Sequence, residues 1–103
     1  MHNDRLLPLL LDAGLSQKEA GLYIAGIELG EATIQRLARH AGIKRPTAYD
    51  VTDSLEKKGL FSVSTRGKKR YFIAEDPENV LGLLKTREQA FLRALPELKV
   101  LFN

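Results

Sequence analysis

The segment that decides the fold spans residues 41–60 and reads AGIKRPTAYDVTDSLEKKGL. After Pro46, apolar and small residues recur at the three- and four-residue spacing of a helix, and proline is tolerated in a helix's first turn. Gly59 follows the last periodic residue, where glycine commonly ends a helix. The segment therefore predicts a helix from about Arg45 to Lys58, with Ala48, Val51, Thr52 and Leu55 on its inner face.

A shorter helix is predicted immediately before this one. Thr33 is a suitable N-cap because its hydroxyl can accept a hydrogen bond from a free backbone N–H. Gly42 ends the helix, and Ile43 lies in the turn that follows. Two helices joined by a short glycine-containing turn form a helix-turn-helix unit. The inner face of the shorter helix is predicted to comprise Ile34, Leu37, Ala38 and Ala41.

Two further helices are predicted nearer the N-terminus. The leucine-rich stretch Asp4–Asp12 forms the first, which is closed by Gly14. Ser16-Gln17-Lys18-Glu19 is a capping box, in which the serine hydroxyl and the glutamate side chain satisfy each other's backbone N–H groups. It starts a second helix, which ends at Gly30. The apolar residues at helical spacing, which predict its inner face, are Ala20, Tyr23, Ile24, Ile27 and Leu29.

A β-hairpin and a long helix complete the chain. Residues 60–64 and 70–74 have strand composition and are joined by a basic glycine turn over residues 65–69. Asp76 is predicted to cap the last helix, and Pro96 to kink or restart it because proline has no N–H to donate. The elements predict a mainly α-helical fold with a small β-hairpin, namely a winged helix-turn-helix domain over residues 1–75 and a C-terminal dimerisation helix over residues 76–103.

The composition limits the possible classes of function. The chain has 103 residues, which fits one small domain, and it has no cysteine, which excludes disulfides and thiolate chemistry. His2 and His40 lack neighbours at metal-ligand spacing, and the serines lack a paired His–Asp arrangement. We therefore expect no metal site, no cofactor and no enzymatic activity.

The sequence also predicts where the protein resides. No apolar run approaches the roughly 18 residues needed to cross a bilayer. The first residues lack the basic region, apolar run and cleavage site of a signal peptide. We expect a soluble, cytoplasmic protein with no membrane partner.

Positive charge is concentrated in the middle of the chain. From Arg36 to Arg70, ten basic residues stand against three acidic ones, a net charge of +7, whereas the remainder carries −4 and the whole chain +3. Such a region indicates a surface for a polyanion, and its alternative interpretation is a solvated face with interspersed charges. Combined with the helix-turn-helix, it predicts double-stranded DNA as the partner.

The base contacts are predicted on the second helix of the unit, whose N-terminal residues meet base edges in the major groove. Arg45 is suited to a guanine, Thr47 to a thymine methyl or a phosphate, and Tyr49 to a phosphate or the sugar edge. Asp50 repels phosphates unless it accepts from a cytosine amine, and its alternative role is to orient Arg45 or Arg39.

The glycine turn is predicted to act as a wing. Arg66 and Lys68 are expected to contact the phosphate backbone, whereas strand alternation sends one of Lys69 and Arg70 to the opposite face. The predicted DNA-contacting residues are Lys44, Arg45, Pro46, Thr47, Tyr49, Arg66, Lys68, Lys69 and Arg39.

The closing helix carries an apolar row whose members alternate four and three residues apart, with Arg87 as its single polar member. Three interpretations are open: packing on its own domain, pairing with the same helix of a second chain, or leading into a further domain. A helix of about 25 residues spans nearly 40 Å, which is more than so small a domain easily covers. We therefore expect a homodimer, which would present two recognition helices to successive major grooves. The predicted dimerisation residues are Val80, Leu84, Phe91, Ala94, Leu98 and Leu101.

The alternative function is a winged-helix module for protein–protein contact, with the last helix as its interface. The basic wing argues against it, because a protein-binding wing does not need so much positive charge.

Several motifs together resemble the TrmB-type transcriptional regulators. They are LSQKEA at residues 15–20, GEAT at 30–33, AGIKRPTAYDV at 41–51, LEKKGL at 55–60, GKKRY at 67–71 and DPE at 76–78. The resemblance implies a homodimeric DNA-binding regulator. In the longest members a sugar-binding domain follows the last helix, so no effector site is carried over to this chain, which is either a short member of the family or a fragment.

Overall fold

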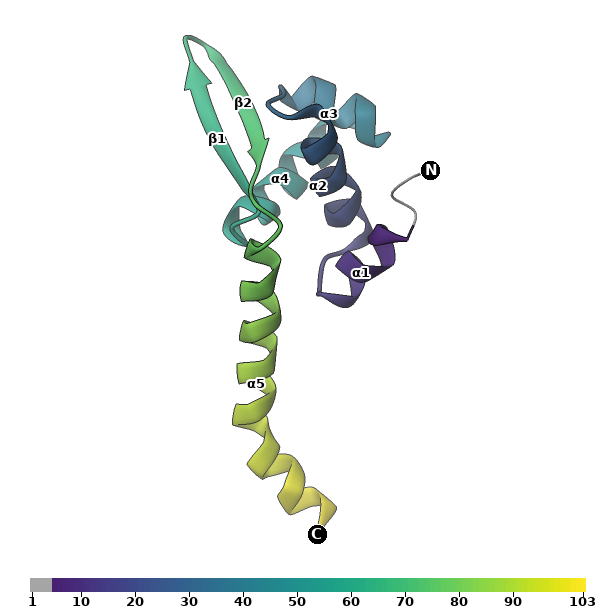
Figure 1. Cartoon of the computed structure of the whole chain (residues 1–103), viewed down its shortest axis with the longest axis vertical. Helices are drawn as coiled ribbons and strands as arrows, with labels where there is room; N and C mark the ends of the chain where they lie inside the picture. The colour runs from purple at the N-terminus through teal and green to yellow at the C-terminus, as the bar shows by residue number, and fades with distance from the viewer. Residues whose placement is uncertain (1–4) are drawn as a thin grey trace.

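The computed structural model describes residues 5–103. Figure 1 shows a lobe of short helices with a projecting hairpin, and one long helix that extends away from this lobe. The predicted mainly α-helical arrangement with one hairpin is confirmed. The predicted first residue of the N-terminal helix, Asp4, lies outside the described residues. The elements are α1 (Leu6–Asp12), α2 (Gln17–Leu29), α3 (Ile34–Ala41), α4 (Arg45–Lys57), β1 (Phe61–Arg66), β2 (Lys69–Ala74) and α5 (Asn79–Phe102).

The predicted local signals set the ends of α2 and α3. The Ser16 hydroxyl accepts from the Glu19 backbone N–H at 3.1 Å, and the Glu19 carboxylate accepts from the Ser16 N–H at 2.8 Å, which confirms the capping box. The Thr33 hydroxyl caps α3 by accepting from the Arg36 N–H. Gly42 ends α3 with a φ of +72°, a left-handed conformation that glycine adopts at little cost.

The core lies between α2, α3, α4 and the hairpin. All four residues predicted for the inner face of α4 are buried. The prediction for α2 was wrong at Ile27, which is 48% exposed, whereas Leu22 and Ala25 are buried instead. The reason is that α1, α3, α4 and β2 all pack around α2, so that no single apolar stripe marks its buried side. The largest fully buried side chains are Tyr23, Phe72, Leu22, Leu37, Leu55, Leu60 and Thr52.

The hairpin is longer and its turn is tighter than predicted. The antiparallel register runs from Phe61 opposite Ala74 to Arg66 opposite Lys69, so that only two residues form the turn. Gly67 has a φ of +64°, and glycine at the first central position is typical of two-residue hairpin turns. Because the ladder continues to the turn, Arg66, Lys69 and Arg70 lie on strand backbone, and Lys68 lies in the turn itself.

The last helix begins later than predicted. The Asp76 carboxylate accepts from the Glu78 N–H at 2.8 Å within a preceding turn, and α5 starts at Asn79. Pro96 lies inside α5, which continues as one helix to Phe102, and Figure 1 shows the C-terminal part bent away from the first part. Of the helices in residues 5–103, none is long and apolar enough to cross a membrane.

Candidate nucleic-acid interface

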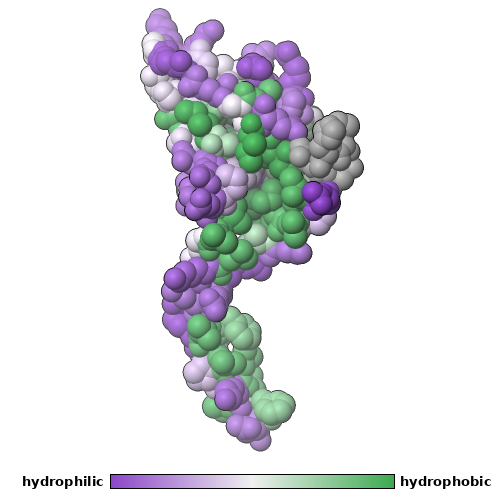
Figure 2. All heavy atoms as spheres, viewed as in Figure 1, coloured by the Kyte–Doolittle hydropathy of each residue, from purple (hydrophilic) through white to green (hydrophobic). Residues whose placement is uncertain are grey.

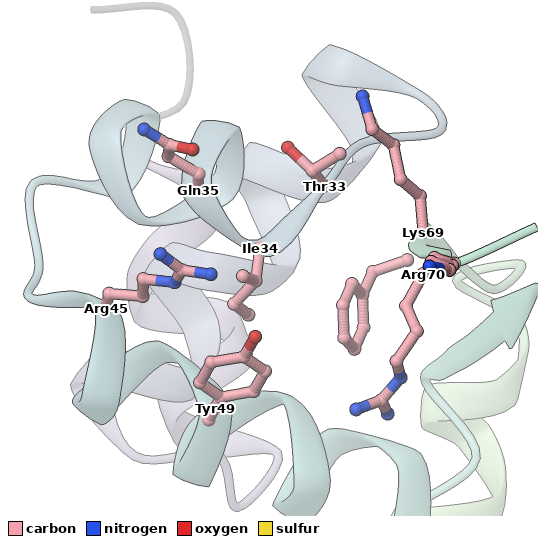
Figure 3. Close-up of a pocket in the computed structure, with 9 residues that line it drawn as sticks. Thr33, Ile34, Gln35, Arg45, Tyr49, Lys69 and Arg70 are labelled. Carbon is pink, nitrogen blue, oxygen red and sulfur yellow. The ribbon is translucent and has the colours of Figure 1, made fainter. Parts of the chain in front are cut away.

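A hollow opens between the start of α3, the start of α4 and the wing, and we call it the basic hollow. Its volume is about 340 Å³. In Figure 3, Arg45 and Tyr49 rise from α4 on one side, and Arg70 reaches across from β2 on the other. Thr33 and Gln35 lie at its α3 rim. The lining residues are Thr33, Ile34, Gln35, Arg45, Tyr49, Lys68, Lys69, Arg70 and Phe72.

The basic hollow carries only positive formal charge. Its lining contains Arg45, Lys68, Lys69 and Arg70 but no aspartate or glutamate. Within the described residues, none of these four cations forms an ion pair. Arg70 instead stacks its guanidinium carbon 5.2 Å from the centre of the Phe72 ring. Because four exposed cations share one concavity, the hollow attracts anions such as phosphates.

The first turn of α4 presents its polar residues to solvent. Ala48 is fully buried, and burying it turns Arg45 and Tyr49 outward at helical spacing. Lys44, Pro46 and Asp50 are exposed as well, whereas Thr47 is half-buried.

Four of the predicted contact residues are brought together at the basic hollow, namely Arg45, Tyr49, Lys68 and Lys69. Arg39 is not among them: with Leu29, Arg36 and His40 it lines a separate, smaller hollow, where the His40 ring nitrogen lies 2.9 Å from Glu28.

Arg66 also lies outside the basic hollow. It forms an ion pair with Glu31, which precedes α3, and its guanidinium carbon lies 4.1 Å from the centre of the Tyr71 ring. The sequence could not reveal this partner, because Glu31 is 35 positions away from Arg66.

Arg70, Thr33 and Gln35 line the hollow without having been selected from the sequence. The signal for Arg70 was its spacing from Phe72, since residues two apart in a strand share a face and Phe72 is buried. Figure 3 shows the side chains of Lys69 and Arg70 leaving β2 in opposite directions, as expected from strand alternation, although both residues line the hollow.

A buried carboxylate fixes α4 against α2. Glu19 accepts from Lys58 Nζ at 2.8 Å with each carboxylate oxygen and also accepts from the Ser54 hydroxyl. Burial alone would raise the pKa of Glu19, but the hydrogen bonds from Lys58, Ser54 and the Ser16 backbone outweigh it and hold the pKa below its usual value. Glu19 therefore stays ionised at neutral pH and keeps α4 in place.

A second long-range interaction, a hydrogen bond, anchors the segment that connects the wing to α5. The buried Tyr23 hydroxyl donates to the Glu75 carbonyl at 2.7 Å. Burial, followed by the nearby charges of Asp76 and Glu75, raises the pKa of Tyr23, so its hydroxyl stays a donor. This bond ties the end of β2 to α2 inside the core.

The apolar row of α5 is uncovered. No residue of α5 is buried, although Val80 and Leu83 pack against the core. Phe91 is 58% exposed and Leu101 is 83% exposed. Figure 2 shows hydrophobic side chains along α5 that continue onto the adjoining part of the lobe.

Within residues 5–103, no cluster of three or more histidine, aspartate or glutamate side chains could hold a metal ion. A helix-turn-helix pair with a basic hairpin beside its second helix defines a winged helix-turn-helix protein.

The chain belongs to the TrmB family: the model of the sugar-specific transcriptional regulator TrmB matches residues 9–78. This is a family of transcriptional regulators and not of enzymes, as predicted. The chain is 39% identical over 82 residues to the DNA-binding transcriptional repressor TrmBL2 of Thermococcus kodakarensis, covering 79% of this chain and 31% of that protein. It is 28% identical over 85 residues to the sugar-sensing transcriptional regulator TrmBL1 of Pyrococcus furiosus, covering 82% of this chain and 25% of that protein. The chain thus spans about a third or less of the length of these relatives.

Solved structures show the same fold. The structure of TrmBL2, described as an archaeal chromatin protein with a novel mode of DNA binding, superposes with a TM-score of 0.75 at 33% identity, covering 94% of this chain and 37% of that one. NadR in complex with 4-hydroxyphenylacetate superposes with a TM-score of 0.61 at 23% identity, covering 97% of this chain and 77% of that one. The second likeness concerns the fold alone.

Proposed function

We propose that this chain binds duplex DNA as a sequence-specific transcriptional regulator. The observation that carries the proposal is the basic hollow, which is lined by four cations from α4 and the wing and by no acidic residue. The names of the relatives support it, since TrmBL2 of Thermococcus kodakarensis is a DNA-binding transcriptional repressor.

In the proposed complex, the N-terminal turn of α4 enters the major groove. Arg45 is exposed at its first position and offers the fork that pairs with the O6 and N7 of guanine. Lys44, Pro46 and Thr47 flank it at the same end of the helix, and Thr47 is suited to a thymine methyl or a phosphate.

The DNA backbone would then lie along the basic hollow. Lys68, Lys69 and Arg70 line it from the wing, and the Tyr49 hydroxyl offers a donor from α4. Thr33 and Gln35 bring the start of α3 to the same place, and the free N–H groups of a helix start favour a phosphate. Contacts to phosphate position the protein, and Arg45 supplies the sequence preference.

We further propose that the protein acts as a homodimer through α5. Leu84, Phe91, Ala94, Leu98 and Leu101 are exposed along one side of this helix, and an apolar face of this length is unfavourable in water. A second copy of α5 would cover it, and the two-fold axis would present two copies of α4 to successive major grooves.

The test of DNA binding is the salt dependence of affinity for a fluorescent random-sequence duplex. Six or more phosphate contacts weaken binding about 10³-fold or more between roughly 50 and 200 mM salt. Arg45→Ala is expected to cost about 1–3 kcal/mol on a selected operator and to relax its sequence preference. Lys57→Ala is the matched control, because Lys57 lies at the far end of α4 in an ion pair with Asp53. Absence of binding at 50 mM salt would contradict the proposal and favour a protein-contact module.

The test of the dimer is the mass of the particle in solution. Phe91→Glu with Leu98→Glu places two charges on the apolar row and is expected to yield monomers in sedimentation experiments. Val100→Glu is the control, because Val100 is exposed and lies about 200° around the helix from Leu98. A wild-type protein that is monomeric at micromolar concentration would contradict the proposed dimer.

A further inference from the structure

One cation of the wing, Arg66, forms contacts outside the basic hollow. Arg66 is the last residue of β1 and directly precedes the turn. A cation at the tip of a wing is expected to contact the phosphate backbone. The Arg66 guanidinium nevertheless pairs with Glu31 and stacks 4.1 Å from the centre of the Tyr71 ring. Lys68, Lys69 and Arg70, its neighbours along the hairpin, line the basic hollow, whereas Arg66 does not.

The strand register explains why Arg66 and Arg70 are separated. Val63 lies opposite Phe72 and Ser64 opposite Tyr71, so that Val63 and Phe72 share the face that packs on the core. Alternation then places Arg66 and Tyr71 together on the other face. Stacking on Tyr71 holds the guanidinium on that outer face.

Glu31 approaches the hairpin from its far edge. The next residue, Ala32, forms an antiparallel bridge with Phe72. The Ala32 N–H donates to the Phe72 carbonyl with an N···O distance of 3.1 Å, and the Phe72 N–H donates to the Ala32 carbonyl with an N···O distance of 2.7 Å. The segment before α3 therefore lies beside β2 like a third strand. The contact from Arg66 to Glu31 thus connects β1 to the helical lobe across β2 and the Tyr71 ring.

We propose that Arg66 is a positioning residue and not a DNA contact: with Tyr71 and Glu31 it forms a brace that fixes the angle of the wing over α4. The proposal rests on the proposed DNA binding, since the braced wing is the one that presents Lys68 and Arg70 to the backbone. We refer to these three residues as the wing brace.

Two physical arguments favour a brace. A two-stranded hairpin is marginally stable by itself, so a projecting wing needs support from the lobe to keep one angle. In addition, a guanidinium already neutralised by Glu31 would have to break that pair before it could release a counterion from a phosphate. Arg66 in its observed position therefore adds nothing to the number of ions released on binding.

The sharpest test exchanges the two charges. Arg66→Ala is expected to weaken binding to a random-sequence duplex about 3–10-fold while the slope of log K against log salt stays unchanged, because no phosphate contact is lost. Arg66→Glu alone is expected to weaken binding further, and adding Glu31→Arg, which restores the ion pair, is expected to recover affinity to the level of Arg66→Ala or better. If Arg66 contacts phosphate, its replacement by alanine lowers the slope by about 0.9 and the exchange recovers nothing, which would overturn the proposal.

Two comparisons complete the test. Lys68→Ala serves as the phosphate-contact control and is expected to lower the salt slope by about 0.9. Tyr71→Phe keeps the ring and is expected to bind like the wild type, whereas Tyr71→Leu removes the stack and is expected to match Arg66→Ala. Glu31→Ala distinguishes the two possible roles of Arg66 most simply. If Arg66 is part of the wing brace, the substitution weakens DNA binding. If Arg66 contacts phosphate, the substitution frees its guanidinium for DNA and strengthens binding.

Hydrogen exchange of the free protein distinguishes failure of the brace from failure of DNA binding. Arg66→Ala and Glu31→Ala are each expected to accelerate exchange of the amides in β1 and β2 near the turn, whether or not the protein binds DNA. Unchanged exchange in both variants would overturn the brace. Wild-type protein that shows no salt-dependent binding would overturn the DNA-binding proposal, while the exchange result would still decide whether the brace exists.

Discussion

Lys58 Nζ lies 2.8 Å from both carboxylate oxygens of Glu19, although the two residues are 39 positions apart. Glu19 is the third residue of α2, and Lys58 directly follows α4. The same carboxylate also accepts from Ser16 in its own cap and from Ser54 in α4. One side chain therefore both caps the start of α2 and fixes the end of α4.

Removing the charge of Glu19 is expected to destabilise the lobe. Glu19→Gln keeps the shape but leaves Lys58 and the Ser16 N–H with a weaker acceptor, and we expect a loss of about 1–3 kcal/mol in the free energy of unfolding. Urea denaturation monitored by circular dichroism measures it. Lys57→Met is the control and is expected to change stability by less than about 0.5 kcal/mol, because its pair with Asp53 is exposed. Equal losses in the two variants would contradict a special role for the buried pair.

The same carboxylate predicts the pH dependence of stability. The folded pKa of Glu19 lies below its unfolded value near 4.5, so its stabilising contribution is present above that value and is lost as the pH falls through the folded pKa. The unfolding free energies of the wild type and Glu19→Gln should therefore differ at pH 7 and converge as the pH is lowered below 4. Urea titrations across this range provide the measurement, and a difference that persists in full at pH 2 would contradict the assignment.

Two glycines of α2 are expected to respond in opposite directions to alanine. A Cβ at Gly26 would lie 2.6 Å from Phe61 Cζ, so Gly26→Ala must displace the ring and is expected to cost about 1–3 kcal/mol. A Cβ at Gly21 meets nothing within 4 Å, so Gly21→Ala is expected to stabilise the protein by up to about 1 kcal/mol through helix propensity. Thermal melts of both variants provide the comparison. A stabilised Gly26→Ala protein would show that α2 and β1 are not in close contact.

The turn of the wing depends on glycine. Gly67 has a φ of +64°, and Gly67→Ala is expected to cost about 1 kcal/mol because a Cβ is disfavoured there. The added side chain meets no atom within 4 Å, so the cost arises from the backbone alone. Hydrogen exchange of residues 62–72 should accelerate, while exchange within α2 stays unchanged. Uniform acceleration through the whole lobe would instead indicate that the hairpin is required for folding.

Local interactions made much of the fold predictable. Capping boxes, glycine ends and helical spacing act over three or four residues, so Ser16, Thr33 and Gly42 determined helix boundaries by themselves. The inner face of α4 was also readable, because one side of that helix is polar and one is apolar. The charge density of residues 36–70 likewise identified the region that forms the basic hollow.

The partners of charged and apolar side chains were decided by the tertiary structure. Arg66 and Arg70 look equivalent in sequence, yet the strand register directs Arg70 to the basic hollow and Arg66 to Glu31. Leu22 replaced Ile27 in the core because several elements surround α2. Such outcomes depend on contacts between different elements, whose geometry exists only once the elements have packed. The sequence alone determined the elements and the sign of their charge, and packing decided which charges meet a partner within the lobe and which line the basic hollow without one.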